Sequence, residues 1–312
     1  MKSLQLSFEA VAPIFILMLL GYVLKTLHLG SKAVFDGLNK LIFRVFLPVL
    51  LFYNIYKTEP AAVFDGRLIL FCVIGILLVF VIGYFAVLKM TDENARRGVM
   101  LQGFFRSNVA FLGIVLVDYI CAENTTGLAS LTVAVAVPLV NVLAVVCLER
   151  FRHGKPNFWV LLKGIFTNPL VIGCALGLVF AAIDLTLPKV LEAAVSDVAK
   201  TATPLAMIVL GASFTFSSLR GYTKEICITV LAKLIFIPLL SVLTAVLLGF
   251  RGEALACILC TFATPVAVAS FSMAQQMDGD EKLASHVVVI SSAFCVVTLF
   301  LFIFALDYLH LF

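Results

Sequence analysis

Long apolar runs follow one another along the whole chain, and they constrain its fold more than any other feature. The first extends from Phe8 to Leu27 and the last from Ala284 to Tyr308. A helix that crosses a bilayer needs about 20 mostly apolar residues. Strands of a membrane barrel instead alternate polar and apolar residues over about 10 positions. The runs here do not alternate, so we expect helices that cross a membrane.

Composition supports this expectation. Hydrophobic residues make up 62% of the chain and charged residues 13%, whereas soluble proteins carry roughly 25% charged residues. The first apolar run is too long for the core of a signal peptide, and no small-residue cleavage site follows it. We therefore expect an all-α integral membrane protein with no removable leader and with the lipid bilayer as its surroundings.

Ten spans can be marked from the apolar runs and the short polar connections between them. The longest polar connection, residues 149–157, lies at mid-chain and is expected to join two halves. We expect the spans at residues 8–27, 38–57, 67–90, 98–118, 127–149, 160–183, 189–214, 225–249, 254–276 and 284–308.

A shift of half the 312-residue chain brings similar residues of the two halves into register. The matched pairs are Pro13 with Pro169, Gly21 with Gly177, Arg44 with Lys200, Pro48 with Pro204, and Asn108 with Thr264. The simpler alternative is chance coincidence in an apolar sequence. Each half holds an odd number of spans, so the second half starts on the opposite side of the membrane. We therefore expect two inverted five-helix repeats, residues 1–156 and 157–312.

Charge bias orients the spans. The loops that follow spans 1, 3, 5, 7 and 9 carry most of the Lys and Arg residues, and such loops are retained in the cytoplasm. We expect a multi-pass protein of the cell inner (plasma) membrane with both termini on the extracytoplasmic side. The basic residues do not form a nucleic-acid patch, so no nucleic-acid partner is expected.

Two spans carry the signals of a helix interruption, at Ser107-Asn108-Val109 and at Ala263-Thr264-Pro265. Asn and Thr are good N-caps, so we expect Asn108 and Thr264 to begin new half-helices. Proline costs nothing at the first helical position, where we expect Pro265. Gly113 is expected to loosen the first of these spans further.

Polar residues gather around both breaks. In an inverted repeat the two broken helices cross, and their half-helix N-termini converge near the bilayer midplane. Each N-terminus carries about half a positive charge and unpaired N–H groups, which suit an anion. We expect the substrate site to include Gln102, Arg106, Ser107, Asn108, Asn141, Thr261, Thr264 and Pro265.

Several of these residues have structural alternatives. A lone intramembrane Asn, such as Asn141, can serve an interhelical hydrogen bond of about 1 kcal/mol. Arg106 can neutralise a substrate carboxylate or pair with carbonyl groups at a helix end. Lys233, inside span 8, and Gln275 are candidates for coupling or charge balance. We expect Arg44 and Lys200, which lie near span ends, to extend toward the interface and to be structural.

Motifs of other functions are missing. Cys257 and Cys260 lie one turn apart in a span without a second pair or a nearby His, so we expect no metal and no cofactor. The chain has no H-E-x-x-H, G-x-S-x-G or Walker motif. We therefore expect neither an enzyme nor a directly ATP-driven pump.

The pieces Leu47-Pro48-Val-Leu-Leu-Phe52, Ser107-Asn108-x-x-Phe111-Leu-Gly113, Asn168-Pro169-Leu170 and Ala263-Thr264-Pro265 together resemble the auxin efflux carrier family. The resemblance runs along essentially the whole chain. It differs in one place: many relatives have Gly-Leu-Pro where this chain has Gly113-Ile-Val115. The short mid-chain loop makes the chain similar to the compact bacterial members of the family.

The resemblance implies a bile-acid/sodium symporter-like fold, with broken helices 4 and 9 crossing. Helices 1, 2, 6 and 7 would form a scaffold, and helices 3–5 and 8–10 a transport domain that moves like an elevator. It also implies a homodimer and a small carboxylate substrate, such as malate, malonate or an auxin-like indole carboxylate. The crossover asparagine of the family maps to Asn108, and its polar residue in helix 5 maps to Asn141.

Three functions remain open at this stage. The leading hypothesis is a secondary transporter of small organic anions. The second is a receptor or sensor that binds without transporting. The third is a sodium-coupled symporter of the bile-acid-transporter type, for which Thr264, Gln275 and Gln276 offer oxygen ligands.

Overall fold

The structure, a computed structural model, describes residues 2–57, 65–121, 127–152 and 158–312, and these residues are helical without a regular β-sheet. Five helical segments are long and apolar enough to cross a membrane, and three shorter helices are also apolar. The long segments are Gly66–Met90, Leu128–Arg152, Lys189–Ser213, Phe216–Leu247 and Glu281–Tyr308; the shorter ones are Ala12–Thr26, Pro169–Ala182 and Gly252–Ala263. The chain is therefore an all-α protein with several membrane-spanning helices.

The elements of the first half begin with the long helix α1 and end with the long helix α7. In order they are α1 (Lys2–Thr26), α2 (Lys32–Leu41), the π-helical turn η1 (Ile42–Phe46), α3 (Leu47–Tyr56), α4 (Gly66–Met90), α5 (Asn94–Phe105), α6 (Val109–Ile120) and α7 (Leu128–Arg152). The expected joint between the halves, at residues 156 and 157, falls in the 153–157 gap, outside the described residues.

The second half ends with the long helix α15. Its elements are α8 (Phe158–Phe166), α9 (Pro169–Ala182), α10 (Lys189–Ser213), the 3-10 helix η2 (Phe216–Tyr222), α11 (Thr223–Leu231), the π-helical turn η3 (Ala232–Phe236), α12 (Ile237–Leu247), α13 (Gly252–Ala263), α14 (Ala269–Gln276) and α15 (Glu281–Tyr308).

Prolines shape several of these helices. Pro48 and Pro238 each follow a π-helical turn, η1 and η3 respectively. A proline lacks the N–H of a helical hydrogen bond and clashes with the preceding turn, and a π-turn is one way in which a helix absorbs such a disturbance. Pro138 and Pro204 lie inside continuous helices, α7 and α10.

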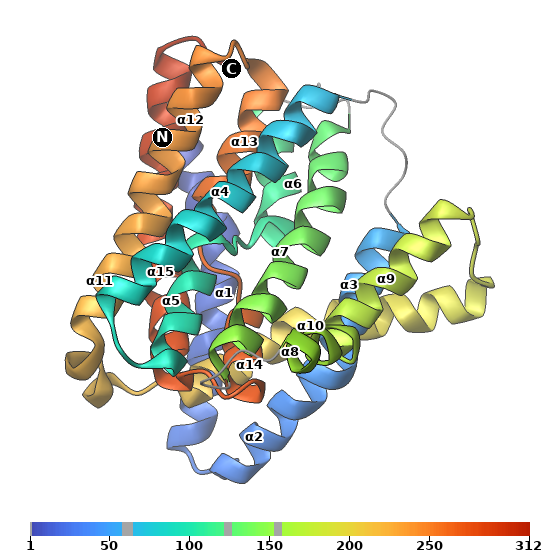
Figure 1. Cartoon of the computed structure of the whole chain (residues 1–312), viewed down its shortest axis with the longest axis vertical. Coiled ribbons are helices and arrows are strands. Elements are labelled where there is room, and N and C mark those ends of the chain that lie inside the picture. The colour runs from blue at the N-terminus through green and yellow to red at the C-terminus, as the bar shows by residue number, and fades with distance from the viewer. Residues whose placement is uncertain (1, 58–64, 122–126, 153–157) are drawn as a thin grey trace.

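The helices fall into two groups. In one group, α1 packs along α10 and α3 packs along α9. In the other, α5 packs against α4 and α7, and α13 packs against α6, α7 and α12. Figure 1 shows α3, α9 and α10 on one side of α7, with α4, α11 and α12 on the other. The two interrupted helices, α5–α6 and α13–α14, belong to the second group, and Ser107, Asn108, Thr264 and Val266 at their breaks are buried.

Candidate functional site

Both predicted helix interruptions are present. Helix α5 ends at Phe105 and α6 begins at Val109, whereas α13 ends at Ala263 and α14 begins at Ala269. The expectation for Gly113 was wrong, because α6 continues through this residue from Val109 to Ile120. Gly113 is buried where an added Cβ would lie 2.7 Å from the Val109 side chain, so its role there is close packing.

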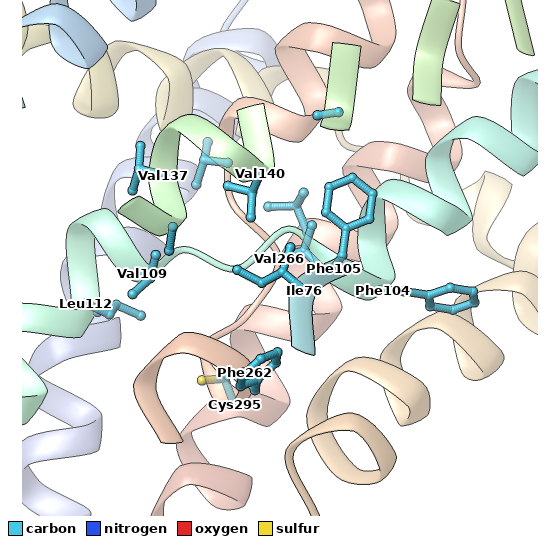
Figure 2. Close-up of a cluster of buried hydrophobic side chains, with 14 of the residues drawn as sticks. Ile76, Phe104, Phe105, Val109, Leu112, Val137, Val140, Phe262, Val266 and Cys295 are labelled. Atoms are coloured by element: carbon cyan, nitrogen blue, oxygen red, sulfur yellow. The ribbon is translucent and has the colours of Figure 1, made fainter. Parts of the chain in front are cut away.

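The two interrupted segments meet and pair with each other. Ser107 and Val266 form an isolated antiparallel bridge. The Asn108 N–H donates to the Pro265 carbonyl at 2.8 Å, and the Ala267 N–H donates to the Arg106 carbonyl at 3.3 Å. Apolar side chains surround this crossing, with Phe105, Val109 and Val266 close to it (Figure 2). The pairing satisfies backbone groups that the breaks would otherwise leave unpaired in a membrane.

The caps of the two breaks differ from each other. The Asn108 carbonyl accepts from the Leu112 N–H at 3.1 Å, so Asn108 stands at the N-cap position that we expected. Thr264 does not: it is the C-cap of α13, and its hydroxyl donates back to the Cys260 carbonyl at 2.9 Å. The residue before a proline avoids helical backbone angles, and Thr264 is extended, with ψ of 151°. Pro265 therefore lies four residues before α14 instead of at its first position.

A cavity of about 370 Å³ lies against the crossing. Its lining comes from both breaks and from α3, α7, α9 and α10: Leu47, Leu50, Leu51, Asn54, Arg106, Ser107, Asn108, Val137, Val140, Asn141, Leu170, Ala199, Lys200, Thr203, Pro204, Ala206, Ala267, Val268 and Ala269. Four of the residues expected in a substrate site thus line one space, namely Arg106, Ser107, Asn108 and Asn141.

Arg106 brings a buried positive charge to the cavity wall. The side chain is buried, with 3% of the residue exposed. One guanidinium nitrogen donates to the Asn141 side-chain oxygen at 2.7 Å, and another contacts the sulfur of Met273. Among the described residues no carboxylate lies within salt-bridge distance of Arg106. A buried cation without an ion partner is costly, and an anion in the cavity would compensate it.

Lys233 lies outside the cavity and bonds residues at both breaks. It lies in the π-turn η3, is fully buried, and donates to the Ser107 hydroxyl and, at 3.1 Å, to the Phe262 carbonyl. Phe262 is in the last turn of α13, where a cation is favourable to the helix dipole. Lys233 thus links the first break to the helix end at the second break, without lining the cavity itself.

The remaining expected site residues lie elsewhere. Gln102 is buried and donates to the Met273 sulfur at 3.6 Å, and the Thr261 hydroxyl donates back to the Cys257 carbonyl at 2.8 Å. Gln275 lies at the junction of α14 with α2 and α15, where it bonds Asn39, Asp36 and Glu281. Together with Thr264 and Pro265, these residues do not line the cavity.

Three polar lining residues were missed by the sequence reasoning. Asn54 comes from α3, and Lys200 and Thr203 come from α10. Lys200 was interpreted as a structural residue near a span end, whereas it faces the same cavity as Arg106. The available signal was the position of Lys200 and Thr203 just before Pro204, in register with Arg44 and Pro48 of the first half.

Fold and cavity together define a multi-pass helical membrane protein with a polar site at the meeting point of two interrupted helices. The chain matches the family described as "Membrane transport protein" over residues 6–303 and belongs to it. This is the auxin efflux carrier family that the sequence resembles. The chain is also similar to an uncharacterized transporter of Methanothermobacter thermautotrophicus, with 24% identity over 94% of this chain and 96% of that protein.

Proposed function

We propose that this membrane transporter carries small organic anions, with carboxylates as the substrate class, through the cavity at the crossing of α5–α6 and α13–α14. The observation that carries the proposal is the buried Arg106, which lines the cavity and has no acidic partner among the described residues. Asn141 orients its guanidinium, and the Asn108 amide and the backbone at the start of α14 offer further donors.

An inverted repeat of five helices is the architecture that best fits this role. An added Cβ on Gly21 would lie 1.9 Å from the Ile208 carbonyl oxygen, and one on Gly177 would lie 2.9 Å from that of Phe52. These two contacts are equivalent under a shift of 156 residues. Gly21 of the first half corresponds to Gly177 of the second, and Phe52 of the first half corresponds to Ile208 of the second. In the same way, the α1–α10 packing corresponds to the α9–α3 packing.

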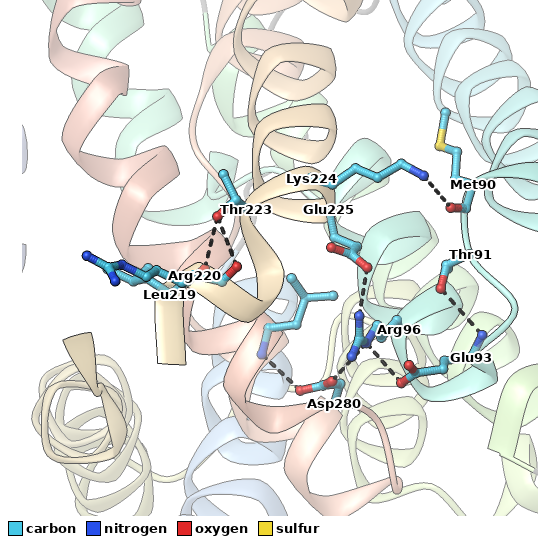
Figure 3. Close-up of polar contacts among 11 residues, drawn as sticks. Met90, Thr91, Glu93, Arg96, Leu219, Arg220, Thr223, Lys224, Glu225 and Asp280 are labelled. Atoms are coloured by element: carbon cyan, nitrogen blue, oxygen red, sulfur yellow. Dashed lines mark hydrogen bonds and ion pairs between the residues drawn. The ribbon is translucent and has the colours of Figure 1, made fainter. Parts of the chain in front are cut away.

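The two groups of helices correspond to a scaffold and a moving body. The scaffold would comprise α1, α2, α3, α8, α9 and α10, and the transport domain α4–α7 and α11–α15. One end of the transport domain is tied together by Arg96 of α5, which pairs with Glu225 of α11 at 2.8 Å and with Asp280 beside α15 at 3.7 Å (Figure 3). Such cross-links favour movement of these helices as one body against the scaffold.

In this proposal the cavity wall divides between the two bodies. Arg106, Asn108 and Asn141 belong to the transport domain, and Asn54, Lys200 and Thr203 belong to the scaffold. A substrate held by Arg106 would travel with the transport domain. It would leave one set of scaffold residues and come to face another. Alternating access of this elevator type requires little rearrangement within the site.

A binding and uptake assay tests the function. Malonate is expected to raise the thermal midpoint of the purified protein in detergent, and labelled malonate is expected to enter liposomes that contain it. Arg106→Gln should weaken binding about 30-fold, equivalent to about 2 kcal/mol, because one partner of a buried charge pair is lost. Uptake with and without sodium separates a sodium-coupled symporter from an uncoupled carrier.

Arg67→Gln is the matched control, because Arg67 lies at the start of α4, away from the cavity, where it donates to the Leu248 carbonyl at 3.1 Å. Its binding and uptake should equal those of the wild type. If Arg106→Gln folds and still transports malonate normally, the anion site is not at the crossing. If the wild type binds malonate without moving it into liposomes, the protein acts as a receptor for this anion.

A further inference from the structure

A second polar cavity lies between the same two groups of helices, farther toward the end that holds α2 and α14. It has a volume of about 610 Å³, and its lining includes Phe43, Arg44, Glu149, Arg152, Lys163 and Asn168. Arg152 is already paired, with Asp278 at 2.6 Å and Glu149 at 3.2 Å. Among the described residues no carboxylate lies within salt-bridge distance of Arg44 or Lys163.

The two cavities are related through the repeat. Ala199 and Lys200 line the first cavity, and Phe43 and Arg44 line the second. These pairs are 156 residues apart, and each is followed by a matching proline, Pro204 or Pro48. In an inverted repeat, equivalent residues lie at equal depths on opposite sides of the midplane. Lys200 and Arg44 therefore present one scaffold cation to each side of the crossing.

The second cavity is separated from Arg106 in this structure. Leu47 and Leu170 are buried and line the first cavity, whereas Asn168, two residues before Leu170, lines the second. Beyond this barrier, Gln275 of α14 donates to Asp36 of α2 at 3.0 Å. The two helix groups are thus in contact on the α2 side, and Arg106 shares its cavity with Lys200 alone of the two scaffold cations.

We propose that the scaffold wall of the second cavity, with Arg44, Lys163 and Asn168, faces the bound anion after the transport domain has moved, so that Arg44 replaces Lys200 as the scaffold cation beside Arg106. This inference rests on the proposed function and adds a second site to it. The anion meets a positive charge on the scaffold in both end states, one supplied by each repeat. Lys163 adds to the positive field of the second cavity, which draws anions toward it.

Transport of labelled malonate measured from each face tests this assignment. Right-side-out and inside-out vesicles from expressing cells give the half-saturating concentration at each face. Lys200→Gln should raise it several-fold at one face and leave the other within about twofold, and Arg44→Gln should do the reverse. The charge bias of the loops assigns Lys200 to the extracytoplasmic face. Arg44→Lys should restore the wild-type value, because it retains the charge.

Matched controls lie close by on the same helices. Lys40→Gln in α2 and Lys189→Gln in α10 remove exposed cations that line neither cavity, and both should behave as the wild type does at both faces. If Arg44→Gln and Lys200→Gln impair the same face, or neither has an effect, the assignment is wrong. Binding and uptake by Arg106→Gln remain a separate test: if that variant is also normal, the proposed function fails as well.

Discussion

The two helix breaks meet at one point, but different interactions hold them open. Residues 106–108 separate α5 from α6 without a proline, and residues 264–268 separate α13 from α14 with Pro265 among them. The first break depends on side chains from other helices, since Lys233 holds Ser107 and Asn141 holds Arg106. The second depends more on its own residues, through Pro265 and the back-bonded Thr264.

This difference separates a break encoded by tertiary contacts from one encoded locally. A proline removes a helical hydrogen bond in any surroundings, so the second break has a local cause in its own sequence, although contacts with distant residues set how far it extends. The first break needs partners for its extended backbone and for two polar side chains, and these partners come from η3, α7 and the other break. We therefore expect the first break to be more sensitive to substitution at a distance.

Lys233→Met should have the largest effect. It leaves the Ser107 hydroxyl and the Phe262 carbonyl without their ammonium donor, and an unsatisfied buried polar group costs about 1–3 kcal/mol. We expect malonate uptake to fall at least tenfold, with a lower thermal midpoint of the purified protein. Lys224→Met is the control, because this exposed lysine contacts the Met90 carbonyl at 3.4 Å, far from the crossing.

Ser107→Ala shows how much of the effect of Lys233→Met comes from the bond to Ser107 alone, since Lys233 and its bond to the Phe262 carbonyl remain. It removes only the hydroxyl that Lys233 bonds, and it should lower uptake less than Lys233→Met does. Normal uptake by a folded Lys233→Met variant would mean that the first break does not depend on Lys233. The two breaks would then not differ in their dependence on distant side chains.

Local signals in the sequence predicted where the helices break. Asn108 can cap a helix within an apolar run, and Pro265 cannot continue one, so both breaks were found at the right residues. The role of Thr264 was misjudged because a threonine hydroxyl can bond forward to a free N–H or back to the carbonyl four residues earlier. Only the pairing of residues 106–108 with 265–267 delays the restart to Ala269, and that pairing joins distant parts of the chain.

The composition of the cavity was only partly predictable for a similar reason. Periodicity shows which residues share a face of one helix, but not how each helix is rotated toward its neighbours. Arg106 and Asn141 were predicted as site residues because polar side chains within a membrane span are costly and usually serve a function. Lys200, Thr203 and Asn54 were not chosen, since the rotation of α10 and α3 toward the crossing depends on packing between distant helices, as at Gly21 and Ile208.

Pro265→Ala tests the locally encoded break and should have an intermediate effect. The alanine restores an N–H and allows α13 to extend, but the hydrogen bonds to Arg106 and Asn108 oppose this extension. We expect a two- to fivefold loss of uptake with a thermal midpoint close to that of the wild type. A larger loss of uptake than that of Lys233→Met would mean that the second break, and not the first, is the more sensitive to substitution.

Ser291→Ala should have the smallest effect, because among the described residues its hydroxyl makes the one side-chain bond from another helix to the backbone of residues 264–268. The Ser291 hydroxyl accepts from the Val266 N–H at 3.2 Å and donates to the Val288 carbonyl at 3.1 Å. Loss of one such bond costs about 1 kcal/mol, so uptake should fall about twofold or less, with a slightly lower thermal midpoint.

Ser292→Ala provides a closely matched control for this last substitution. Ser292 is the next residue of α15, is equally buried, and donates to the same Val288 carbonyl at 2.8 Å, without a bond to Val266. If both alanine variants lose the same stability and uptake, the Ser291–Val266 bond contributes nothing specific to the break. A greater loss in Ser291→Ala alone would measure how much the locally encoded break still depends on α15, and so how far the two breaks differ.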